Sequence, residues 1–582
     1  MRELFSGNEA IALGAYEGGC TAAFGYPGTP STEILENLVK YPGVYCEWSP
    51  NEKVAFEAAA GAAYTGVRSI VTMKHVGLNV AADPMMTLSY IGVVGGMVIC
   101  VADDPGQHSS QTEQDTRQYA RLAKLPILEP ANAKEARDFM VKAFEISEKH
   151  HCPVILRTTT CVSHSRSLLE RGTPVEKAVA EFKKEPSKFV PLPLWGRKMR
   201  INAELRLDRM AEDASADTGL NTIMPGKDDS FGIISSGITA LHCREIFPDA
   251  KILKLGWAYP FPDELIKKFA ASVKKLAVIE EADPILEEHI KSLGIACDGK
   301  NVVPRWGELT PSRLFEVKAA LEGSQIKLPE PVPESGDLPA RPPVFCAGCP
   351  HRALFYALTK HDVIVTGDIG CYTLGVFPPL NRTDTCLCMG GGFTVAHGME
   401  KAGEKKKIVG VLGDSTFFHS GITGLIDAVY NRSSVKLIVL DNRITAMTGH
   451  QDHPGTGVTL MGESTRAASI EGIAKACGMD RISVVNPFDT KEIQKVLKEE
   501  LSAEGPSLII SRAPCPLNER KKDIQKRFIN TAKCKNCKLC LKCGCPAIVI
   551  DQNGSPAIDP VQCAGCELCE QICPFSAIER MA

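Results

Sequence analysis

Two segments of the chain, KIVGVLGDS at residues 407–415 and KLIVLDN at residues 436–442, each join a short apolar run to a polar residue that can bind a ligand. Apolar runs of this length that alternate with helical stretches are typical of buried strands in parallel sheets. The ligands of such sheets usually bind beyond the carboxyl ends of the strands. We therefore expect an α/β domain in which Asp414 and Asn442 lie at one edge of a sheet.

Similar apolar runs occur along most of the chain and predict an α/β protein with several doubly wound parallel sheets. They are SIVTMKH (69–75), MVICVADD (97–104), CPVILRTTT (152–160), FGIISSG (231–237), AKILKLG (250–256), KLAVIEEAD (275–283), DVIVTGDIG (362–370) and PSLIISRAP (506–514). A charged stretch at 183–229 and a proline-rich stretch at 329–343 interrupt the pattern and are typical of linkers. The sequence thus predicts four domains, at residues 1–185, 230–325, 344–520 and 531–582.

The composition excludes several classes of function. The 582 residues are 44% hydrophobic and carry a formal net charge of −3, which gives no positive field for nucleic acid. The most apolar run, residues 91–102, is too short and too rich in glycine to span a bilayer. The first residues lack the pattern of a secretory signal. We expect a cytoplasmic protein that binds neither nucleic acid nor a membrane.

The last fifty residues contain nine of the 23 cysteines. Two CxxCxxC runs, each followed by a Cys-Pro pair, suit two [4Fe–4S] clusters in which the proline-followed cysteine binds the other cluster. One predicted ligand set is Cys534, Cys537, Cys540 and Cys573. The other is Cys563, Cys566, Cys569 and Cys545. Cys543 competes with Cys545, which we prefer because it precedes a proline. Zinc is the alternative, but zinc sites often include His and this tail has none.

Clusters of this kind predict a chain that transfers electrons, in a reducing compartment and an anaerobic host or an oxygen-sensitive enzyme.

Residues 414 and 442 also suit a metal ion. A carboxylate and an amide oxygen, completed by backbone oxygens, fit Mg²⁺, which prefers octahedral oxygen coordination and binds phosphate. Upstream, Met389-Gly390-Gly391-Gly392 precedes a helix-like segment, and a glycine-rich helix entry lets the backbone approach an anion such as a diphosphate. Each feature alone is also compatible with an ordinary turn.

Three further segments contain residue types suited to catalysis. Glu52 begins an Ala-rich helix, where it either complements the helix dipole or acts as an acid. The segment YPGTPS at 26–31 contains Thr29 and either caps a helix or faces a ligand. Cys346 and Cys349 form a CxxC that precedes His351; a redox dithiol or half a zinc site is the alternative reading, and we see no matching CxxC outside the tail.

Together these motifs resemble those of the thiamine-diphosphate-dependent 2-oxoacid:ferredoxin oxidoreductases, and the resemblance covers nearly the whole chain. The Gly-Asp-Ser segment with its later Asn is similar to the metal-diphosphate motif of thiamine enzymes, with Ser415 where glycine is usual. The resemblance implies that Glu52 activates the aminopyrimidine ring and that Thr29 and Arg117 contact substrate, although a solvated helix face is the alternative for Arg117. It also implies contacts from His351 to substrate or cofactor. The implied cofactor contacts are Cys346, Cys349, Met389, Gly390, Gly413, Asp414, Ser415, Asn442 and the backbone carbonyl of Ile444.

The order of the modules is similar to that of alpha subunits of the indolepyruvate-oxidising branch of this family. It implies a pyrimidine-binding domain at 1–185, a middle transketolase-C-terminal-like domain at 230–325, a diphosphate-binding domain at 344–520 and a ferredoxin-like domain at 531–582. The implied reaction is oxidative decarboxylation of aryl 2-oxo acids with CoA and ferredoxin. The implied cofactors are thiamine diphosphate, Mg²⁺ and two [4Fe–4S] clusters. The implied partner is a smaller beta subunit, with two copies of each chain.

Other functions stay open on sequence alone. Pyruvate or 2-oxoglutarate are alternative substrates within the same class. An electron-transfer subunit with a non-catalytic thiamine fold is an alternative of another class, and a non-oxidative decarboxylase is disfavoured because it needs no clusters.

Overall fold

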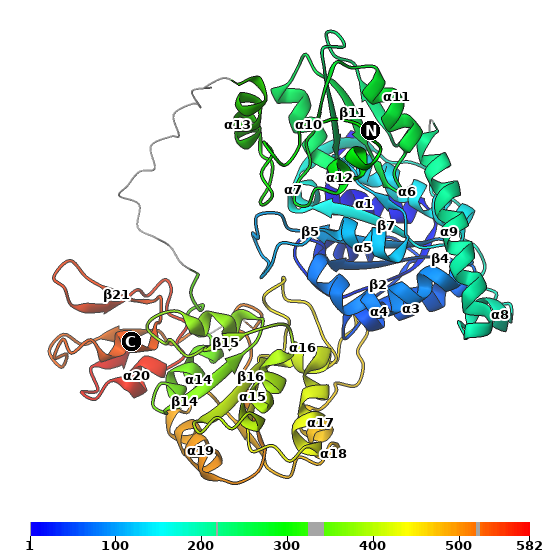
Figure 1. Ribbon diagram of the computed structural model, residues 1–582. Helices are drawn as coiled ribbons and strands as arrows, with labels where there is room; N and C mark the ends of the chain where they lie inside the picture. Colours follow the sequence, from blue (N-terminus) through cyan, green and yellow to red (C-terminus); the bar gives the residue numbers. More distant parts are fainter. Residues whose placement is uncertain (1, 217–218, 324–342, 520–523, 582) are drawn as a thin grey trace. The chain divides into compact units, whose positions relative to one another are not determined.

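The computed structural model describes residues 2–216, 219–323, 343–519 and 524–581, shown in Figure 1. These residues divide into two compact units, Met1–Asp337 and Leu338–Ala582. The boundary between the units falls within the proline-rich stretch 329–343, of which only residue 343 is among the described residues. Every apolar run named above forms a strand, which confirms the α/β prediction.

The first unit contains a seven-stranded sheet whose strands are parallel except at one edge. In spatial order the strands are β12 (Trp257–Tyr259), β6 (Ile127–Leu128), β7 (Val154–Thr159), β5 (Met97–Asp103), β4 (Arg68–Lys74), β2 (Cys20–Gly25) and β3 (Tyr45–Trp48). The helices that connect them are α1 (Gly7–Glu17), α2 (Thr32–Leu38), α3 (Glu52–Tyr64), α4 (His75–Ile91), α5 (Thr116–Ala123), α6 (Ala133–His150) and α7 (Thr160–His164). A separate pair joins β1 (Arg2–Ser6) to β8 (Arg166–Glu170).

A second, four-stranded sheet completes the first unit. Its order is β13 (Lys275–Val278), β10 (Phe231–Ser236), β11 (Lys251–Leu255) and β9 (Thr222–Met224), the last antiparallel to its neighbour. Its helices are α10 (Gly237–Ile246), α11 (Asp263–Ala271), α12 (Ile285–Ser292) and α13 (Pro311–Glu322). Strand β12 follows β11 in the chain but pairs with β6 of the larger sheet. The chain therefore passes directly from the smaller sheet to the edge of the larger one.

The charged stretch at 183–229, which the sequence predicts to be a linker, contains regular secondary structure. It contains α8 (Pro186–Phe189), the 23-residue helix α9 (Pro193–Ser215) and strand β9. The buried side chains of α9 recur every three or four residues, at Met199, Ala203, Arg206, Met210 and Ala214. This spacing places them on one helical face. Pro193 is compatible with the helix because it occupies the first turn.

The second unit contains a six-stranded parallel sheet. Its order is β15 (Thr385–Cys386), β14 (Val363–Gly367), β16 (Lys407–Gly413), β17 (Lys436–Asp441), β19 (Ser507–Arg512) and β18 (Ile482–Val485). Its helices are α14 (Pro350–Leu358), α15 (Gly391–Lys401), α16 (Asp414–Thr416), α17 (Ile422–Tyr430), α18 (Ile470–Ala476) and α19 (Thr490–Ser502). One apolar cluster contains residues of α14 and α19, and the other contains residues of α15, α17 and α18. The sheet is thus covered by helices on both faces, as in a doubly wound fold.

The cysteine-rich end of the chain forms two short antiparallel strand pairs. β20 (Arg527–Ile529) pairs with β23 (Ile578–Arg580), and β21 (Ile548–Ile550) pairs with β22 (Pro556–Ile558). A 3₁₀ turn at Leu539–Cys543 and helix α20 (Leu568–Ile572) lie between the strands. Ala353 of α14 packs in the same apolar cluster as Cys540, Cys543 and Leu568. The cysteine-rich segment, which fits a ferredoxin-like domain, therefore packs directly on the domain that precedes it.

Candidate functional site

Asp414 and Asn442 follow the adjacent parallel strands β16 and β17, so both lie at the carboxyl edge of the sheet. Both side chains are buried, with exposed fractions of 3% and 7%. The carboxylate of Asp414 accepts hydrogen bonds from the backbone N–H groups of Ser415 (2.8 Å) and Arg443 (2.7 Å). The amide oxygen of Asn442 accepts from the N–H of Ile444 at 3.1 Å. The arrangement gathers the oxygen donors that Mg²⁺ prefers.

Two histidines lie beside these oxygen donors. His453 Nε2 is 3.2 Å from Asp414 Oδ2, and His351 Nε2 is 3.4 Å from Asn442 Nδ2. Burial opposes ionisation of Asp414, but His453 and the two backbone N–H groups hold its pKa below the usual value. Burial lowers the pKa of His351 to about 4 against the opposite effect of Asp414, which leaves this imidazole neutral at pH 7.

The glycine turn at 389–392 is shaped by close packing. Gly390 has φ +88°, and a Cβ there would lie 2.0 Å from Ser420 Oγ. A Cβ on Gly392 would lie 2.6 Å from the carbonyl oxygen of Val411, so α15 can approach β16 only without a side chain. The N–H of Gly390 donates to the carboxylate of Asp368 at 3.0 Å, and Ser420 donates to the carbonyl of Met389 at 3.0 Å. Hydrogen bonds with Asp368 and Ser420 therefore fix the predicted helix-entry turn.

The CxxC segment forms the turn before α14. The N–H of Cys349 donates to the carbonyl of Cys346 at 3.1 Å, and Gly348 has φ +76°. Cys346 is exposed, whereas Cys349 is buried at the N-cap of α14. Burial raises the pKa of Cys349 to about 12, so it is a protonated thiol at pH 7. His351 is the second residue of this helix, which is how α14 brings it to Asn442.

Glu52 lies in the first unit as the first residue of α3, and it is 6% exposed. The side chain of Asn51 caps the helix by accepting from the N–H of Val54 at 2.9 Å. A Cβ on Gly77, in helix α4, would lie 2.5 Å from Oε1 of Glu52. The carboxylate therefore rests directly on the backbone of α4, in a position that a larger residue at 77 would block.

Thr29 lies in a turn beside Lys74 and the loop at 109. Ser109 Oγ donates to the carbonyl of Thr29 at 3.3 Å, and Lys74 Nζ donates to the carbonyl of Ser109 at 2.9 Å. Asp104 accepts from the N–H of Ser109 at 2.8 Å and from Thr160 Oγ1 at 2.7 Å. Burial lowers the pKa of Lys74 to about 8, although Asp104 and Glu52 act in the opposite direction. Lys74 thus places a cation close to both Thr29 and Glu52.

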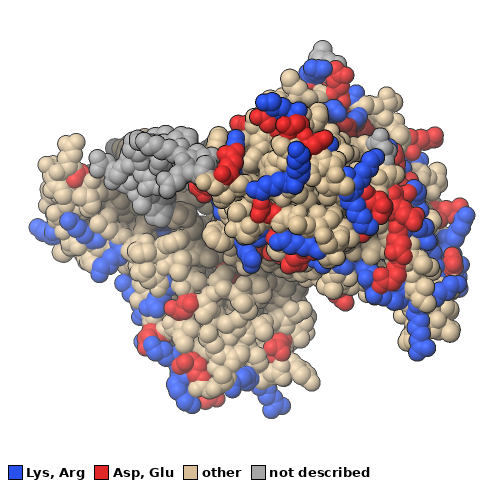
Figure 2. Space-filling model, turned by 45° about the horizontal axis from the view of Figure 1, so that its top comes forward, with Lys and Arg blue, Asp and Glu red and all other residues tan. Residues whose placement is uncertain are grey.

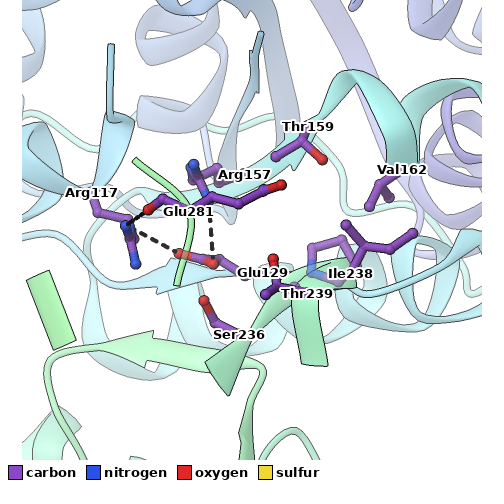
Figure 3. A pocket seen from close by; sticks show the side chains of 11 residues that line it. Arg117, Glu129, Arg157, Thr159, Val162, Ser236, Ile238, Thr239 and Glu281 are labelled. Carbon is purple, nitrogen blue, oxygen red and sulfur yellow. Dashed lines mark hydrogen bonds and ion pairs between the residues drawn. The ribbon is translucent and has the colours of Figure 1, made fainter. Parts of the chain in front are cut away.

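Arg117 is buried, so the alternative of a solvated helix face is wrong, whereas its contact with substrate stays a prediction. Arg117 is 2% exposed, and its guanidinium pairs with Asp115 (2.6 Å) and Glu280 (2.6 Å) and donates to the carbonyl of Glu281 (2.8 Å). Figure 3 shows Arg117 and Arg157 converging on Glu129, at 3.8 Å and 3.3 Å. These contacts tie α5 to the segment after β13 and leave the guanidinium paired with carboxylates.

The tail cysteines fall into two groups, within each of which neighbouring thiols raise one another's pKa. Burial raises the pKa of Cys540, with Cys537, Cys534 and Cys573 acting in the same direction. These four cysteines also line one small cavity. Burial likewise raises the pKa of Cys569, reinforced by neighbouring thiols. Those neighbours are Cys566, Cys543, Cys545 and Cys563.

The second group contains Cys543 as well as the four cysteines of the second predicted set, so the choice between Cys543 and Cys545 stays a prediction. Within the described part of the chain, no three His, Cys, Asp or Glu side chains are spaced as ligands of a single metal ion.

Four residues of these sites were missed by the sequence analysis. Lys74 ends strand β4, and Asp104 and Asp368 follow β5 and β14, so the attention to strand ends that identified Asp414 would also have identified them. His453 lies in a loop with no readable pattern and is placed only by the tertiary fold.

Figure 2 shows positive and negative side chains interspersed over the visible face of the first unit. Among the described residues, the helices include none with the length and apolar character that crossing a bilayer requires.

Comparisons with known proteins identify both thiamine modules. Residues 13–205 match the family described as "Pyruvate flavodoxin/ferredoxin oxidoreductase, thiamine diP-bdg". Residues 368–511 match "Thiamine pyrophosphate enzyme, C-terminal TPP binding domain". A solved 2-oxoglutarate:ferredoxin oxidoreductase from Magnetococcus marinus is similar over 56% of this chain and 65% of its own, with 18% identity and a TM-score of 0.47.

Full-length relatives extend the match across the chain. The indolepyruvate oxidoreductase subunit IorA of Pyrococcus horikoshii is 41% identical over 99% of this chain and 97% of its own length. The protein of the same name from Methanothermobacter marburgensis is 42% identical over 98% and 96%. The resemblance that the motifs predicted is thereby confirmed, and the chain belongs to the IorA family of thiamine-diphosphate-binding oxidoreductase subunits.

Proposed function

We propose that this chain carries out the oxidative decarboxylation of aryl 2-oxo acids, represented by indolepyruvate, with CoA as acyl acceptor and ferredoxin as electron acceptor. The reaction converts the 2-oxo acid, CoA and two oxidised ferredoxins to an aryl-acetyl-CoA, CO₂, two reduced ferredoxins and a proton. The observation that carries the proposal is full-length similarity to relatives named for indolepyruvate, in a chain that retains Glu52, Asp414 and Asn442 in buried positions. Pyruvate and 2-oxoglutarate are the alternative substrates.

The second unit is proposed to hold Mg²⁺ and the diphosphate. Asp414, Asn442 and the carbonyl of Ile444 would bind the ion, with Gly413 and Ser415 setting the backbone around it. The N-terminus of α15, entered through Met389 and Gly390, would face the diphosphate, because free N–H groups at a helix start favour anions. These donors fit the group, since the two oxygen side chains come from adjacent strand ends and are already buried.

The first unit is proposed to hold the pyrimidine ring and the reacting acid. Thiamine diphosphate, when bound, supplies a nucleophilic carbon and an electron sink for decarboxylation. Glu52 would donate or accept the proton at the aminopyrimidine. Thr29 would contact the substrate. Lys74 would be the cation for the substrate carboxylate in preference to the ion-paired Arg117, because it lies beside both Glu52 and the Thr29 turn. His351, neutral at pH 7, and Cys346 and Cys349 would line the cofactor side.

The tail is proposed to hold two [4Fe–4S] clusters, which would together take the two electrons of the reaction one at a time. The two groups of thiols support this arrangement.

A second, smaller subunit is proposed to complete the enzyme. Relatives with this name are described as subunits, so the chain is part of a larger assembly. We infer a partner on the order of 150–230 residues, about one domain or slightly more. Two copies of each chain would follow the two-fold symmetry common among such assemblies. Mass photometry of the purified complex measures this composition, and full turnover by the chain alone would contradict it.

The function is tested by anaerobic viologen reduction with the purified complex. The substrates are indolepyruvate, phenylpyruvate, pyruvate and 2-oxoglutarate, each with and without CoA. We expect the highest kcat/KM for an aryl substrate and turnover only with CoA. If pyruvate or 2-oxoglutarate gives the higher kcat/KM, that acid is the substrate and the aryl assignment is wrong. Viologen reduction with none of the four would support the electron-transfer alternative.

A further inference from the structure

Arg352 is a buried cation that lies between the thiamine module and the cysteine-rich tail of the second unit. It belongs to α14 and is 1% exposed. Its guanidinium donates to the carbonyls of Phe345 and Cys346 on one side and to the carbonyl of Gly544 on the other. One side chain therefore joins the turn before α14 to the loop between Cys543 and Cys545.

The charge of Arg352 has no carboxylate to balance it among the residues that the structure describes. Its three acceptors are neutral carbonyls, and its buried Nε–H has no hydrogen-bond partner there. The two arginines that are as fully buried are paired, Arg527 with Glu567 and Glu570 and Arg117 with Asp115 and Glu280. Arg206, at 6% exposed, resembles Arg352 in donating to a backbone carbonyl, that of Ser89, but it belongs to the first unit, whereas the cysteine-rich tail belongs to the second. A buried charge without a counter-charge is costly, so an anion in contact with Arg352 is expected.

The cation lies beside the loop of Cys543 and Cys545, because it donates to the carbonyl of Gly544 between them, and its charge also acts on Cys349. Burial raises the pKa of Cys543 and Cys566, and the Arg352 charge acts in the opposite direction on both. A [4Fe–4S] cluster with four thiolates carries net negative charge and becomes more negative when reduced. A fixed cation beside it stabilises the reduced form more than the oxidised form, so it raises the reduction potential.

Arg352 is also the next residue in sequence after His351, which belongs to the proposed cofactor site. His351 contacts Asn442 at 3.4 Å, and Arg352 contacts Gly544, which adjoins Cys545. These contacts form a continuous path through α14 from the metal-diphosphate residues to the second ligand set. The first ligand set lies beside exposed lysines instead, including Lys535 and Lys538, whose charge water screens.

We propose that Arg352 is the counter-cation of the cluster held by Cys545, Cys563, Cys566 and Cys569, and that it makes this cluster the first electron acceptor. The cluster held by Cys534, Cys537, Cys540 and Cys573 is then the exit to the external carrier. This assignment rests on the proposed function, because it requires both clusters. Iron analysis separates a failure of the proposed function from a failure of this inference. Absence of iron refutes the function, whereas loaded clusters with unchanged reduction potentials refute only the role of Arg352.

The test compares three variants of the complete complex, prepared anaerobically and loaded with clusters. Arg352→Gln removes the charge, Arg352→Lys keeps it while losing the fork of hydrogen bonds, and Lys538→Gln removes an exposed charge as a matched control. Redox titration followed by low-temperature paramagnetic resonance measures both cluster potentials. The signal of each cluster is assigned with Cys545→Ser.

We expect Arg352→Gln to shift the one-electron equilibrium of the Cys545 cluster toward the oxidised form by about tenfold, equivalent to about 59 mV. Arg352→Lys should shift it by less than threefold, and Lys538→Gln should leave it unchanged. In freeze-quenched turnover of the parent, the Cys545 cluster should be reduced before the other.

Equal potentials in the parent and in Arg352→Gln would overturn the proposal. So would an equal shift in Arg352→Lys and Arg352→Gln, since contacts rather than charge would then act. If Arg352→Gln does not retain its cluster, Arg352→Lys decides alone: a shift of tenfold or more refutes the charge role, and a near-parental potential supports it. Earlier reduction of the Cys573 cluster would refute the electron-entry assignment.

Discussion

The carboxylate of Glu52 rests on the backbone of Gly77, so that a methyl group added at Gly77 would stand 2.5 Å from Oε1 of Glu52. Glu52 is the first residue of α3 and Gly77 lies in the first turn of α4, and the two helices pack against each other. The position of the proposed catalytic acid therefore depends on a glycine 25 positions later, whose φ is not in the left-handed region. Space, rather than backbone conformation, requires glycine there.

Gly77→Ala is expected to displace Glu52 and reduce substrate-dependent viologen reduction at least tenfold, while Glu52→Gln should abolish it. The contact lies below any distance that a real Cβ adopts, so the carboxylate must move. Gly61→Ala is the matched control, because Gly61 lies in α3 with open space around its Cα. It should keep full activity and gain roughly 0.5–1 kcal/mol of stability. Activity of Gly77→Ala within twofold of Gly61→Ala would refute the positioning role.

Asp414→Ala is expected to weaken binding of thiamine diphosphate in the presence of Mg²⁺ by at least tenfold. One of two proposed side-chain ligands is lost, and Mg²⁺ tolerates incomplete octahedral coordination poorly. Calorimetric titration of the complex depleted of thiamine diphosphate measures the affinity directly. Asp362→Ala removes an exposed carboxylate of the same unit and should bind the cofactor like the parent. Equal affinities in the two variants would exclude Asp414 from the metal site.

Lys74→Met is expected to raise the KM for the 2-oxo acid at least tenfold with a smaller change in kcat, because a cation facing the substrate carboxylate is removed. Burial lowers the pKa of Lys74 to about 8, so its ammonium is present below that pH and lost above it. The kcat/KM of the parent should therefore fall as the pH rises through about 8, and Lys74→Met should lack this decline.

Lys53→Met supplies the control for Lys74, since Lys53 is an exposed lysine of α3 that pairs with Glu57. A parental KM in Lys74→Met, with the alkaline decline intact, would count against the carboxylate role.

Residues whose place in the fold follows from the local sequence could be predicted, whereas residues placed by partners far away in the chain could not. Asp414 and Asn442 were predictable because strand ends of a parallel sheet meet at one edge, and Glu52 because it begins a helix. The burial of Arg117 could not be predicted, because Glu280 and Glu281, which contact it, lie more than 160 positions away. The role proposed for Arg352 likewise depends on its hydrogen bond to the carbonyl of Gly544, 192 positions later in the chain. No periodicity or motif predicts such pairings.

The remaining prediction separates Cys543 from Cys545 as a cluster ligand. Cys543 is fully buried, burial raises its pKa to about 12, and its Sγ donates to the carbonyl of Cys540 at 3.1 Å. A serine hydroxyl can make the same hydrogen bond, so Cys543→Ser should keep both clusters and about eight irons per chain. Cys545→Ser should lose or perturb one cluster, with up to about four irons missing.

Iron analysis and low-temperature paramagnetic resonance on the two serine variants decide between these cysteines. Both substitutions remove one sulfur from the same loop, so each serves as the control for the other. If Cys543→Ser loses the cluster and Cys545→Ser keeps it, the ligand is Cys543, whose thiol must then give up its hydrogen bond to Cys540. The cation of Arg352 would still face that cluster, because Gly544 lies between the two candidates.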